Sequence, residues 1–380
     1  MSKLSDFVGG GGGLKPFNDL GTVTGTVNLD VSEFGSFRVK QGAGEITLNV
    51  TGKAADTAGY VELFFYPDLE QAVTISGAGL VGNGYKFLPV SLTALNYDTV
   101  SFSVSGQDSA PAGLAFNNDK SKMYILGSNS DSVYEYILST PGNLGTASYN
   151  SVRFSVNFQD SAPRSISFSS DGSKMHMTGG ENNSVYQYSL STNFDLSTAS
   201  YDNVSFSVNA QDSQPSGVVF NSDGSKMYMF GNANDAVFQY TLSTNFDLST
   251  ASYDNVSFSV NAQDINLRDI DFNSDGSKMY IIGNTSKSVD QYTLSTPFDL
   301  STASYDNLRF SVDAQDSLPQ AIEFSSDGLN MYMLGDQTNS VFQYSPTYDL
   351  TPPFLYQIIH TGTAATFNTL GSDYSIEVAT

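Results

Sequence analysis

The chain has 380 residues, with 16 Lys or Arg against 39 Asp or Glu, and a formal net charge of −23 at pH 7. A charge of this sign and size repels phosphate groups and anionic lipid surfaces, so it excludes nucleic-acid binding through a basic face and attachment to such membranes. The chain contains no cysteine, which excludes disulfide bonds, thiolate metal sites and cysteine nucleophiles.

The N-terminal segment ends in five consecutive glycines, Gly9, Gly10, Gly11, Gly12 and Gly13. No apolar segment of the kind found in signal peptides precedes these glycines, so we expect no signal peptide. The chain also has no run of about 18 apolar residues, so no membrane insertion is expected. We predict that residues 1–14 form a flexible, Gly-rich N-terminal anchor.

Both flanks of the chain carry strand-like runs separated by Gly, Asp and Pro. In the N-terminal flank these runs lie at residues 22–31, 45–50, 60–66 and 72–76. In the C-terminal flank they lie at residues 354–360 and 374–378. The C-terminal flank is too short to bury a core alone. We therefore predict that residues 15–96 and 350–380 form one small antiparallel β-domain, interrupted by the middle of the chain.

The middle of the chain, residues 97–349, consists of a repeat in five copies without insertion or deletion. Its clearest marker is a Gln-Asp pair whose aspartate recurs every 52 residues, at Asp108, Asp160, Asp212, Asp264 and Asp316. A tyrosine keeps the same interval, at Tyr97, Tyr149, Tyr201, Tyr253 and Tyr305. This regularity indicates one supersecondary unit repeated five times.

Each copy contains four short strand patterns, which the third copy shows most clearly. In that copy the patterns lie at Val204–Val208, Ser216–Phe220, Met227–Phe230 and Val237–Leu242. An Asp-Gly turn at Asp223 joins the second pattern to the third, as in a tight hairpin. Four antiparallel strands per repeat are typical of a β-propeller blade. The sequence therefore predicts an all-β protein with a five-bladed β-propeller inserted into the small β-domain.

The two ends of the repeat array predict how the ring closes. The first copy begins with an extra strand at Thr99–Val104, and the last copy ends at Val341–Tyr344 without a closing strand. We predict a one-plus-three closure, in which Val100–Val104 completes the blade of residues 319–345. An open solenoid is the alternative, but it leaves both strands unpaired. Closure places the two ends of the propeller side by side, which is the condition for insertion into another domain.

The third copy resembles a propeller repeat of bacterial and phage proteins. The matching segments are Asp212-Ser-Gln-Pro-Ser-Gly-Val-Val-Phe220, Asp223-Gly-Ser-Lys-Met-Tyr228 and Val237-Phe-Gln-Tyr-Thr-Leu-Ser-Thr244. Other copies depart from the pattern at Lys120, Leu267 and Leu329-Asn330.

The flanking domain resembles the small β-module of tail-fibre-like virion proteins of tailed bacteriophages, on the segment Gly21-Thr-Val-Thr-Gly-Thr-Val-Asn-Leu-Asp30 and on the poly-Gly leader. The resemblance implies a virion structural protein (tail fibre, baseplate or decoration component), made in the host cytoplasm. It implies other virion proteins as partners, with Gly9–Gly13 as an anchoring segment, and a homo-oligomer, with a trimer favoured. It also implies a propeller that faces the host and meets a surface glycan or receptor.

Differences between the copies indicate where a partner would bind. The loop between the second and third strands varies, and so does the approach to the innermost strand, whereas the Asp-Gly turns are nearly constant. In a four-stranded meander the two variable loops lie on one face. The candidate receptor-binding residues on this face are Arg164, Asn182, Asp235, Arg268, Lys287 and Gln320.

No catalytic residue is predicted, and the chain is expected not to be an enzyme. His176 stands where other copies have tyrosine, and His360 follows a strand in the flank; both are interpreted as packing residues. Asp271 and Glu323 occupy equivalent positions on the innermost strand and are a weaker alternative, as a glycosidase carboxylate pair. We expect no cofactor.

The metal content stays open. The five Gln-Asp aspartates could ring the channel and hold a divalent cation, but carboxylates so far apart cannot all reach one ion. They are interpreted as capping the turns before the innermost strands. The alternative function for the whole chain is a carbohydrate-binding or polysaccharide-degrading propeller protein.

Overall fold

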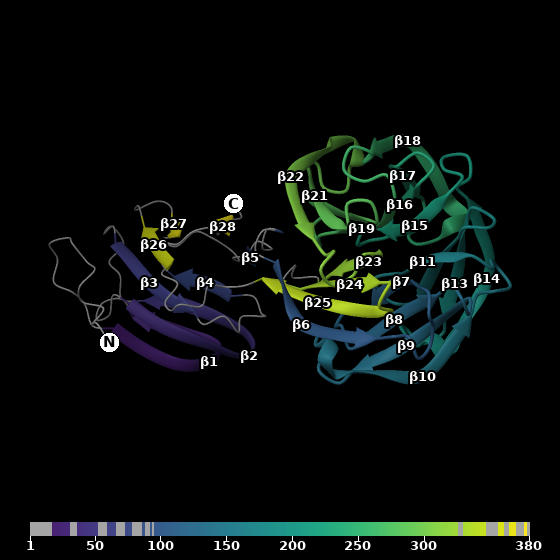
Figure 1. Cartoon of the computed structure of the whole chain (residues 1–380). Helices are drawn as coiled ribbons and strands as arrows, with labels where there is room; N and C mark the ends of the chain where they lie inside the picture. The colour runs from purple at the N-terminus through teal and green to yellow at the C-terminus, as the bar shows by residue number, and fades with distance from the viewer. Residues whose placement is uncertain are drawn as a thin grey trace. The chain divides into compact units, whose positions relative to one another are not determined.

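The computed structural model describes most of the propeller and the strands of both flanks (Figure 1). The described residues are 17–30, 36–51, 59–65, 73–77, 86–87, 92, 95–325, 330–346, 356–360, 365–369 and 376–377. Two compact units are present: Val90–Thr347, and a unit built from both ends of the chain, Met1–Pro89 with Tyr348–Thr380. Within the described residues no helix is long and apolar enough to span a bilayer. The predicted anchor, made of Gly9, Gly10, Gly11, Gly12 and Gly13, lies outside the described residues.

Five four-stranded antiparallel sheets form the larger unit. Blade one contains β7 (Pro111–Phe116), β8 (Lys122–Gly127), β9 (Ser132–Leu138) and β10 (Ala147–Ser155). Blade two contains β11 (Pro163–Phe168), β12 (Lys174–Gly179), β13 (Ser184–Leu190) and β14 (Ala199–Ser207). Blade three contains β15 (Pro215–Phe220), β16 (Lys226–Gly231), β17 (Ala236–Leu242) and β18 (Ala251–Ser259). Blade four contains β19 (Leu267–Phe272), β20 (Lys278–Gly283), β21 (Ser288–Leu294) and β22 (Ala303–Ser311).

Blade five is assembled from both ends of the unit. It contains β23 (Pro319–Phe324), β24 (Met331–Gly335), β25 (Ser340–Pro346) and β6 (Leu95–Ser103). The pairing of β25 with β6 places Val341 opposite Phe102 and Tyr344 opposite Tyr97. The predicted five-bladed propeller and its one-plus-three closure are therefore confirmed. In Figure 1 the first strand of each blade, β7, β11, β15, β19 and β23, lies innermost.

Burial along each strand explains the sequence patterns. The second strand of each blade is almost wholly buried, because its sheet is covered on both faces by neighbouring blades. The fourth strand alternates exposed and half-buried residues, because only one of its faces packs inward. The continuous apolar run Met227–Phe230 thus marks the second strand of blade three, and the alternating run Val204–Val208 marks the fourth strand of blade two.

Aromatic contacts join each blade to the next. Phe154 on β10 packs edge-on against Tyr188 on β13, with ring centroids 5.5 Å apart. The same contact closes the ring between Phe102 on β6 and Tyr136 on β9, also at 5.5 Å. Aromatic pairs of this geometry contribute about 0.5–1.5 kcal/mol beyond the area they bury. The ring is thus closed by the same contact that joins its other blades.

The turns between the first two strands of a blade follow the predicted chemistry. Gly172, Gly224 and Gly276 have φ of +71°, +73° and +72°, which favours glycine. In blade one Lys120 takes this place with φ +57°. The long connections between the third and fourth strands each contain one 3-10 turn, at Leu144–Thr146, Leu196–Thr198, Leu248–Thr250 and Leu300–Thr302.

The smaller unit contains one mixed sheet. Its strands are β1 (Phe17–Asp30), β2 (Ser36–Thr51), β3 (Gly59–Phe65), β4 (Val73–Gly77), β26 (Tyr356–His360) and β27 (Ala365–Thr369). The C-terminal β26 pairs antiparallel with β3, and a second small sheet joins β5 (Lys86–Phe87) to β28 (Ile376–Glu377). The expectation of a purely antiparallel domain is corrected, because β2 pairs in parallel with β1, β3 and β4. A two-residue alternation fits either direction, so the sequence pattern could not decide it.

Candidate functional site

A buried aspartate in each blade ties the two variable loops together. In blade two, Asp160 accepts hydrogen bonds from the backbone N–H of Ala162 at 2.9 Å and of Asn182 at 3.0 Å. The first donor precedes the innermost strand, and the second lies between β12 and β13. The predicted placement of both loops on one face is therefore confirmed. Equivalent bonds are made by Asp108, Asp212, Asp264 and Asp316.

These aspartates act as loop ties, each within its own blade, as the turn-capping interpretation predicted. No group of three or more His, Asp or Glu residues suited to a metal ion occurs within the described part of the chain. A glycine lies beside each aspartate for a steric reason. A Cβ atom on Gly231 would lie 2.4 Å from Cγ of Asp212, so the tie leaves no room for a side chain at that position.

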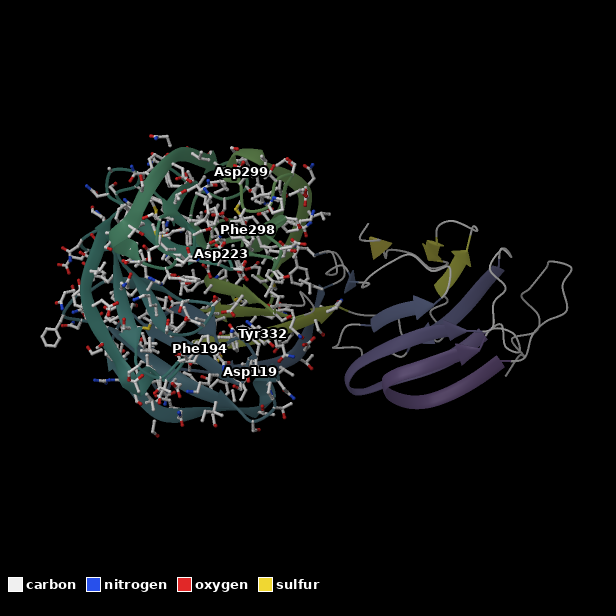
Figure 2. The ribbon with its side chains drawn as sticks, turned by 180° about the vertical axis from the view of Figure 1, so that it is seen from behind. Asp119, Phe194, Asp223, Phe298, Asp299 and Tyr332 are labelled. Carbon is white, nitrogen blue, oxygen red and sulfur yellow. The ribbon has the colours of Figure 1, made fainter. Side chains whose placement is uncertain are left out.

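The opposite face carries the near-constant turns and connections. The backbone N–H of Phe194, in the connection after β13, donates to the carbonyl oxygen of Gly172 at 2.9 Å. Figure 2 labels residues of these turns and connections on the propeller ring, among them Asp119, Phe194, Asp223 and Phe298. This face is built from repeated backbone contacts, whereas the face with the tied loops differs from blade to blade.

A cavity of about 370 Å³ opens on the face with the tied loops. Its lining includes the residue that follows the first position of every innermost strand, namely Ala112, Arg164, Ser216, Arg268 and Gln320. These positions are related by the 52-residue repeat and come from all five blades, so the cavity lies on the propeller axis. Further polar lining comes from Ser128, Ser161 and Asp336. The structure therefore brings together three of the six candidate residues: Arg164, Arg268 and Gln320.

The two arginines have different neighbours. Arg164 is exposed and lies over Gly180, where a Cβ atom would be 2.6 Å from the arginine Nε. Arg268 is half-buried and is held by the amide of Asn284. With that amide oriented so that its oxygen faces the guanidinium, the oxygen accepts hydrogen bonds from Nε at 2.8 Å and from Nη2 at 3.0 Å.

Charged groups of both signs act on the cavity. Burial lowers the pKa of Arg268, and the positive charge of Arg164 lowers it further, whereas the carboxylates of Asp336 and Asp264 raise it. Burial also raises the pKa of Asp336, and the negative charge of Asp316 adds to that effect. Within the described residues neither arginine forms an ion pair within 4.0 Å. The lining therefore presents two guanidinium groups and one carboxylate, and the tied aspartates Asp264 and Asp316 act on them from close by.

The other three candidate residues lie in the loops between the second and third strands and contact their own blades. Asn182 donates from its side chain to Asp160. Asp235 accepts a hydrogen bond from Asn261 at 2.8 Å. Lys287 pairs with Asp313 at 3.1 Å. These three residues do not line the central cavity, and their proposed contact with a partner stays a prediction.

Sequence reasoning missed two residues that shape the cavity, Asn284 and Asp336. Both occupy the first position of a variable loop, equivalent to Gly180 in blade two. Comparison of the copies at that one position would have found them.

The carboxylates of the innermost strands serve as links between blades. Asp271 accepts hydrogen bonds from the backbone N–H of Phe272 and of Phe324, both at 2.8 Å. Glu323 accepts one from the N–H of Phe116 at 3.0 Å and pairs with Lys120. Burial raises the pKa of Asp271 to about 7, and the charge of Glu323 contributes. All four carboxylate oxygens of the alternative glycosidase pair are thus engaged: one bonds within β19, one joins β19 to β23, and two join β23 to blade one.

His176 packs as a replacement for tyrosine, as predicted. Its ring is fully buried on β12 and lies tilted against the ring of Phe220, with centroids 4.4 Å apart. Its Nε2 lies 3.0 Å from the carbonyl oxygen of Phe246. The hydroxyl of Tyr228, at the equivalent position in blade three, donates to the carbonyl oxygen of Phe298. His360 ends β26 in the other unit.

Among known proteins, similarity to this chain is found only with solved structures. No family model and no curated protein matches the chain. A periplasmic gluconolactonase from Pseudomonas aeruginosa is 14% identical, with a TM-score of 0.40, over 71% of this chain and 73% of that one. A protein from Bacteroides uniformis, provisionally a 6-phosphogluconolactonase, is 13% identical with a TM-score of 0.40, over 69% of this chain and 71% of that one. A protein of unknown function from Desulfotomaculum acetoxidans is 12% identical with a TM-score of 0.39, over 68% of each chain.

The expectation that the chain is not an enzyme was wrong, and these matches correct it. Proteins named as lactonases are among the similar structures. Sequence reasoning excluded catalysis because no familiar catalytic motif was found, but a fold that hosts enzymes does not require such a motif. The matches share a fold at low identity and assign no reaction to this chain.

Proposed function

We propose that the chain is a structural protein of a bacteriophage virion whose propeller binds the host surface through the face that carries the central cavity. The observation that carries the binding part is the cavity itself. Five equivalent positions present five side chains of four kinds there, on a scaffold whose other face is nearly constant. A constant scaffold with a variable, polar cavity is a common arrangement for recognition.

The virion part of the proposal rests on the resemblance of the flanking strands and of the Gly-rich leader to tail-fibre-like proteins. On this proposal Gly9–Gly13 anchor the chain to other virion proteins, and the protein works as a homo-oligomer, with a trimer favoured. Several copies multiply a weak contact into firm attachment. The partner is then a host surface glycan or receptor.

Two measurements test this proposal. The protein is sought by mass spectrometry in purified particles, and the purified chain is added to susceptible cells before infection. We expect the protein in the particles and slower adsorption, with the slowing lost in the double variant R164A/R268S. Particles without the protein would contradict the virion role, and unchanged adsorption would contradict the receptor role.

A second candidate function is that of a free carbohydrate-binding or polysaccharide-degrading propeller. The polar lining of the cavity favours this second function, because its side chains can form hydrogen bonds with the hydroxyl groups of a sugar. This holds whether or not a virion carries the protein. The same purified chain, incubated with host capsular polysaccharide, tests this candidate. Release of new reducing ends supports degradation, whereas binding without release supports the role of a lectin.

A further inference from the structure

The two arginines of the cavity form an unusual feature of a strongly acidic protein. The chain carries 16 basic residues against 39 acidic ones, yet Arg164 and Arg268 share one cavity without an ion-pair partner among the described residues. Two like charges at one site disfavour each other unless an anion joins them. The cavity is therefore arranged for an anionic ligand.

The surrounding residues orient the guanidinium group of Arg268 and leave room for that of Arg164. Asn284 orients Arg268 through two hydrogen bonds, and the lack of a side chain at Gly180 lets Arg164 lie across the loop. An arginine held in position binds a carboxylate through two parallel hydrogen bonds with less loss of side-chain freedom. This points to a planar carboxylate as the group that the arginines hold.

The rest of the lining suits a ligand with hydroxyl groups and one negative charge. Asp336 accepts hydrogen bonds and repels a second anionic group. The amide of Gln320 and the hydroxyls of Ser128 and Ser216 can each donate and accept. The carboxylates of Asp336, Asp264 and Asp316 limit the positive charge at the two arginines, so the site suits a ligand with one carboxylate better than a polyanion. The volume of about 370 Å³ lies in the lower part of the range for small-molecule sites.

From this geometry we infer that the central cavity binds a sugar acid, a polyhydroxylated ring with a single carboxylate, with the carboxylate held between Arg164 and Arg268. The inference rests on the binding role proposed above and names the ligand class of that site. On a host surface such a residue occurs as a unit of an acidic glycan.

Titration calorimetry on the purified full chain tests the inference. The probes are sodium D-glucuronate, D-galacturonate and N-acetylneuraminate, with methyl glucoside as the neutral match and inorganic sulfate as the non-sugar anion. We expect at least one sugar acid to bind at least tenfold more tightly than methyl glucoside and than sulfate. Failure of all three sugar acids overturns the inference. Sulfate binding as tight as that of the best sugar acid also overturns it, in favour of a simple anion site.

Variants taken from the other blades locate the site. R164A copies Ala112 of blade one, and R268S copies Ser216 of blade three, so each introduces a residue that the fold already accepts at that position. Each should weaken sugar-acid binding about 10- to 100-fold, because a charge-assisted hydrogen-bonded pair is lost.

R153A is the matched control, because Arg153 is exposed on the outer strand β10 and its loss changes the net charge equally. Its affinity should stay within about twofold of the parent protein. An equal loss of affinity in R153A would overturn the inference, because only the overall charge would then matter. The thermal unfolding midpoint of each variant verifies that it is folded. If a variant fails to fold, the comparison of ligands on the parent protein still tests the inference.

The two proposals fail separately. A chain that binds sugar acids but is absent from particles removes the virion role and leaves the cavity assignment standing. A chain that slows adsorption but binds none of the sugar acids removes the cavity assignment and leaves the receptor role standing.

Discussion

Arg309 and Asp290 face each other directly across the pairing of β22 with β21, and the aspartate is completely buried. The guanidinium Nε lies 2.8 Å from Oδ1 of Asp290, and Nη2 lies 2.9 Å from Oδ2. The hydroxyl of Tyr305 donates to Oδ1 at 2.9 Å. The same position pair in blade three holds Phe238 and Ser257. Blade four thus has an ion pair where blade three has an aromatic ring beside a small hydroxyl.

This exchange predicts a rescue. R309S alone leaves a buried carboxylate with one remaining side-chain donor, so it should lower the free energy of unfolding by about 3 kcal/mol. The double variant D290F/R309S restores the blade-three pair and should recover most of that loss. Urea unfolding of the three proteins measures both effects. A single variant as stable as its parent, or a double variant no better than the single one, would show that the pair is not what holds this site.

The loop ties predict that the position beside each tied aspartate requires glycine for a steric reason. G231A places a Cβ atom 2.4 Å from Cγ of Asp212, so the tie must shift, at a cost of about 1–3 kcal/mol. G106A is the control, because nothing lies within 4 Å of a Cβ there and blade three has Ala210 at the equivalent position. Its unfolding free energy should stay within about 0.5 kcal/mol of the parent. Equal losses in the two variants would disprove the steric explanation.

His176 predicts a loss of stability in acid. Burial lowers its pKa from 6.5 to about 4, so the unfolded chain takes up a proton first as the pH falls. Its contribution is therefore full above about pH 6.5 and is lost between pH 6.5 and pH 4, by about 2 kcal/mol at pH 5.

H176Y restores the tyrosine of the other copies and should remove this part of the pH dependence. Unfolding of the two proteins at pH 7.5 and pH 5 gives the measurement. Asp271, whose raised pKa acts in the opposite direction, is common to both and cancels in the difference. If the unfolding free energy of H176Y falls between pH 7.5 and pH 5 by as much as that of the parent, titration of His176 is ruled out as a source of acid sensitivity.

The seam of the ring should be as strong as any other blade junction. Phe102 packs on Tyr136 with centroids 5.5 Å apart, and Phe206 packs on Tyr240 at 5.7 Å. Both phenylalanines are half-buried, so F102A and F206A should each cost about 2 kcal/mol. Thermal and urea unfolding compare them. A much smaller cost for F102A would mean that the ring opens at the seam before it unfolds.

The blade count and the closure could be predicted because the repeat keeps one interval without insertions, and because an unpaired strand at each end leaves a single way to close. The shared face of the variable loops followed from the alternation of a meander. Comparison of the copies also identifies Arg164, Arg268 and Gln320 from the sequence alone, because these positions differ between otherwise similar repeats.

Other features could not be predicted from the sequence. A period of two is the same in parallel and antiparallel sheets, so the pattern could not reveal that β2 pairs in parallel and the antiparallel expectation was wrong there. Asn182, Asp235 and Lys287 were grouped with the cavity residues because their loops share a face. Loop position does not say whether a side chain reaches the axis or bonds within its own blade, and these three bond within their blades.

The register at the seam pairs Leu95 with Pro346, so the chain enters and leaves the propeller at two residues that lie side by side. Paired residues in antiparallel strands have Cα atoms about 5 Å apart. The two ends of the whole ring are therefore as close together as the two ends of a simple β-hairpin. A propeller with more blades, or with entirely different loops, would present the same two adjacent ends to the segments on either side. On the binding role proposed above, exchange of the whole propeller would then replace one specificity with another in a single step.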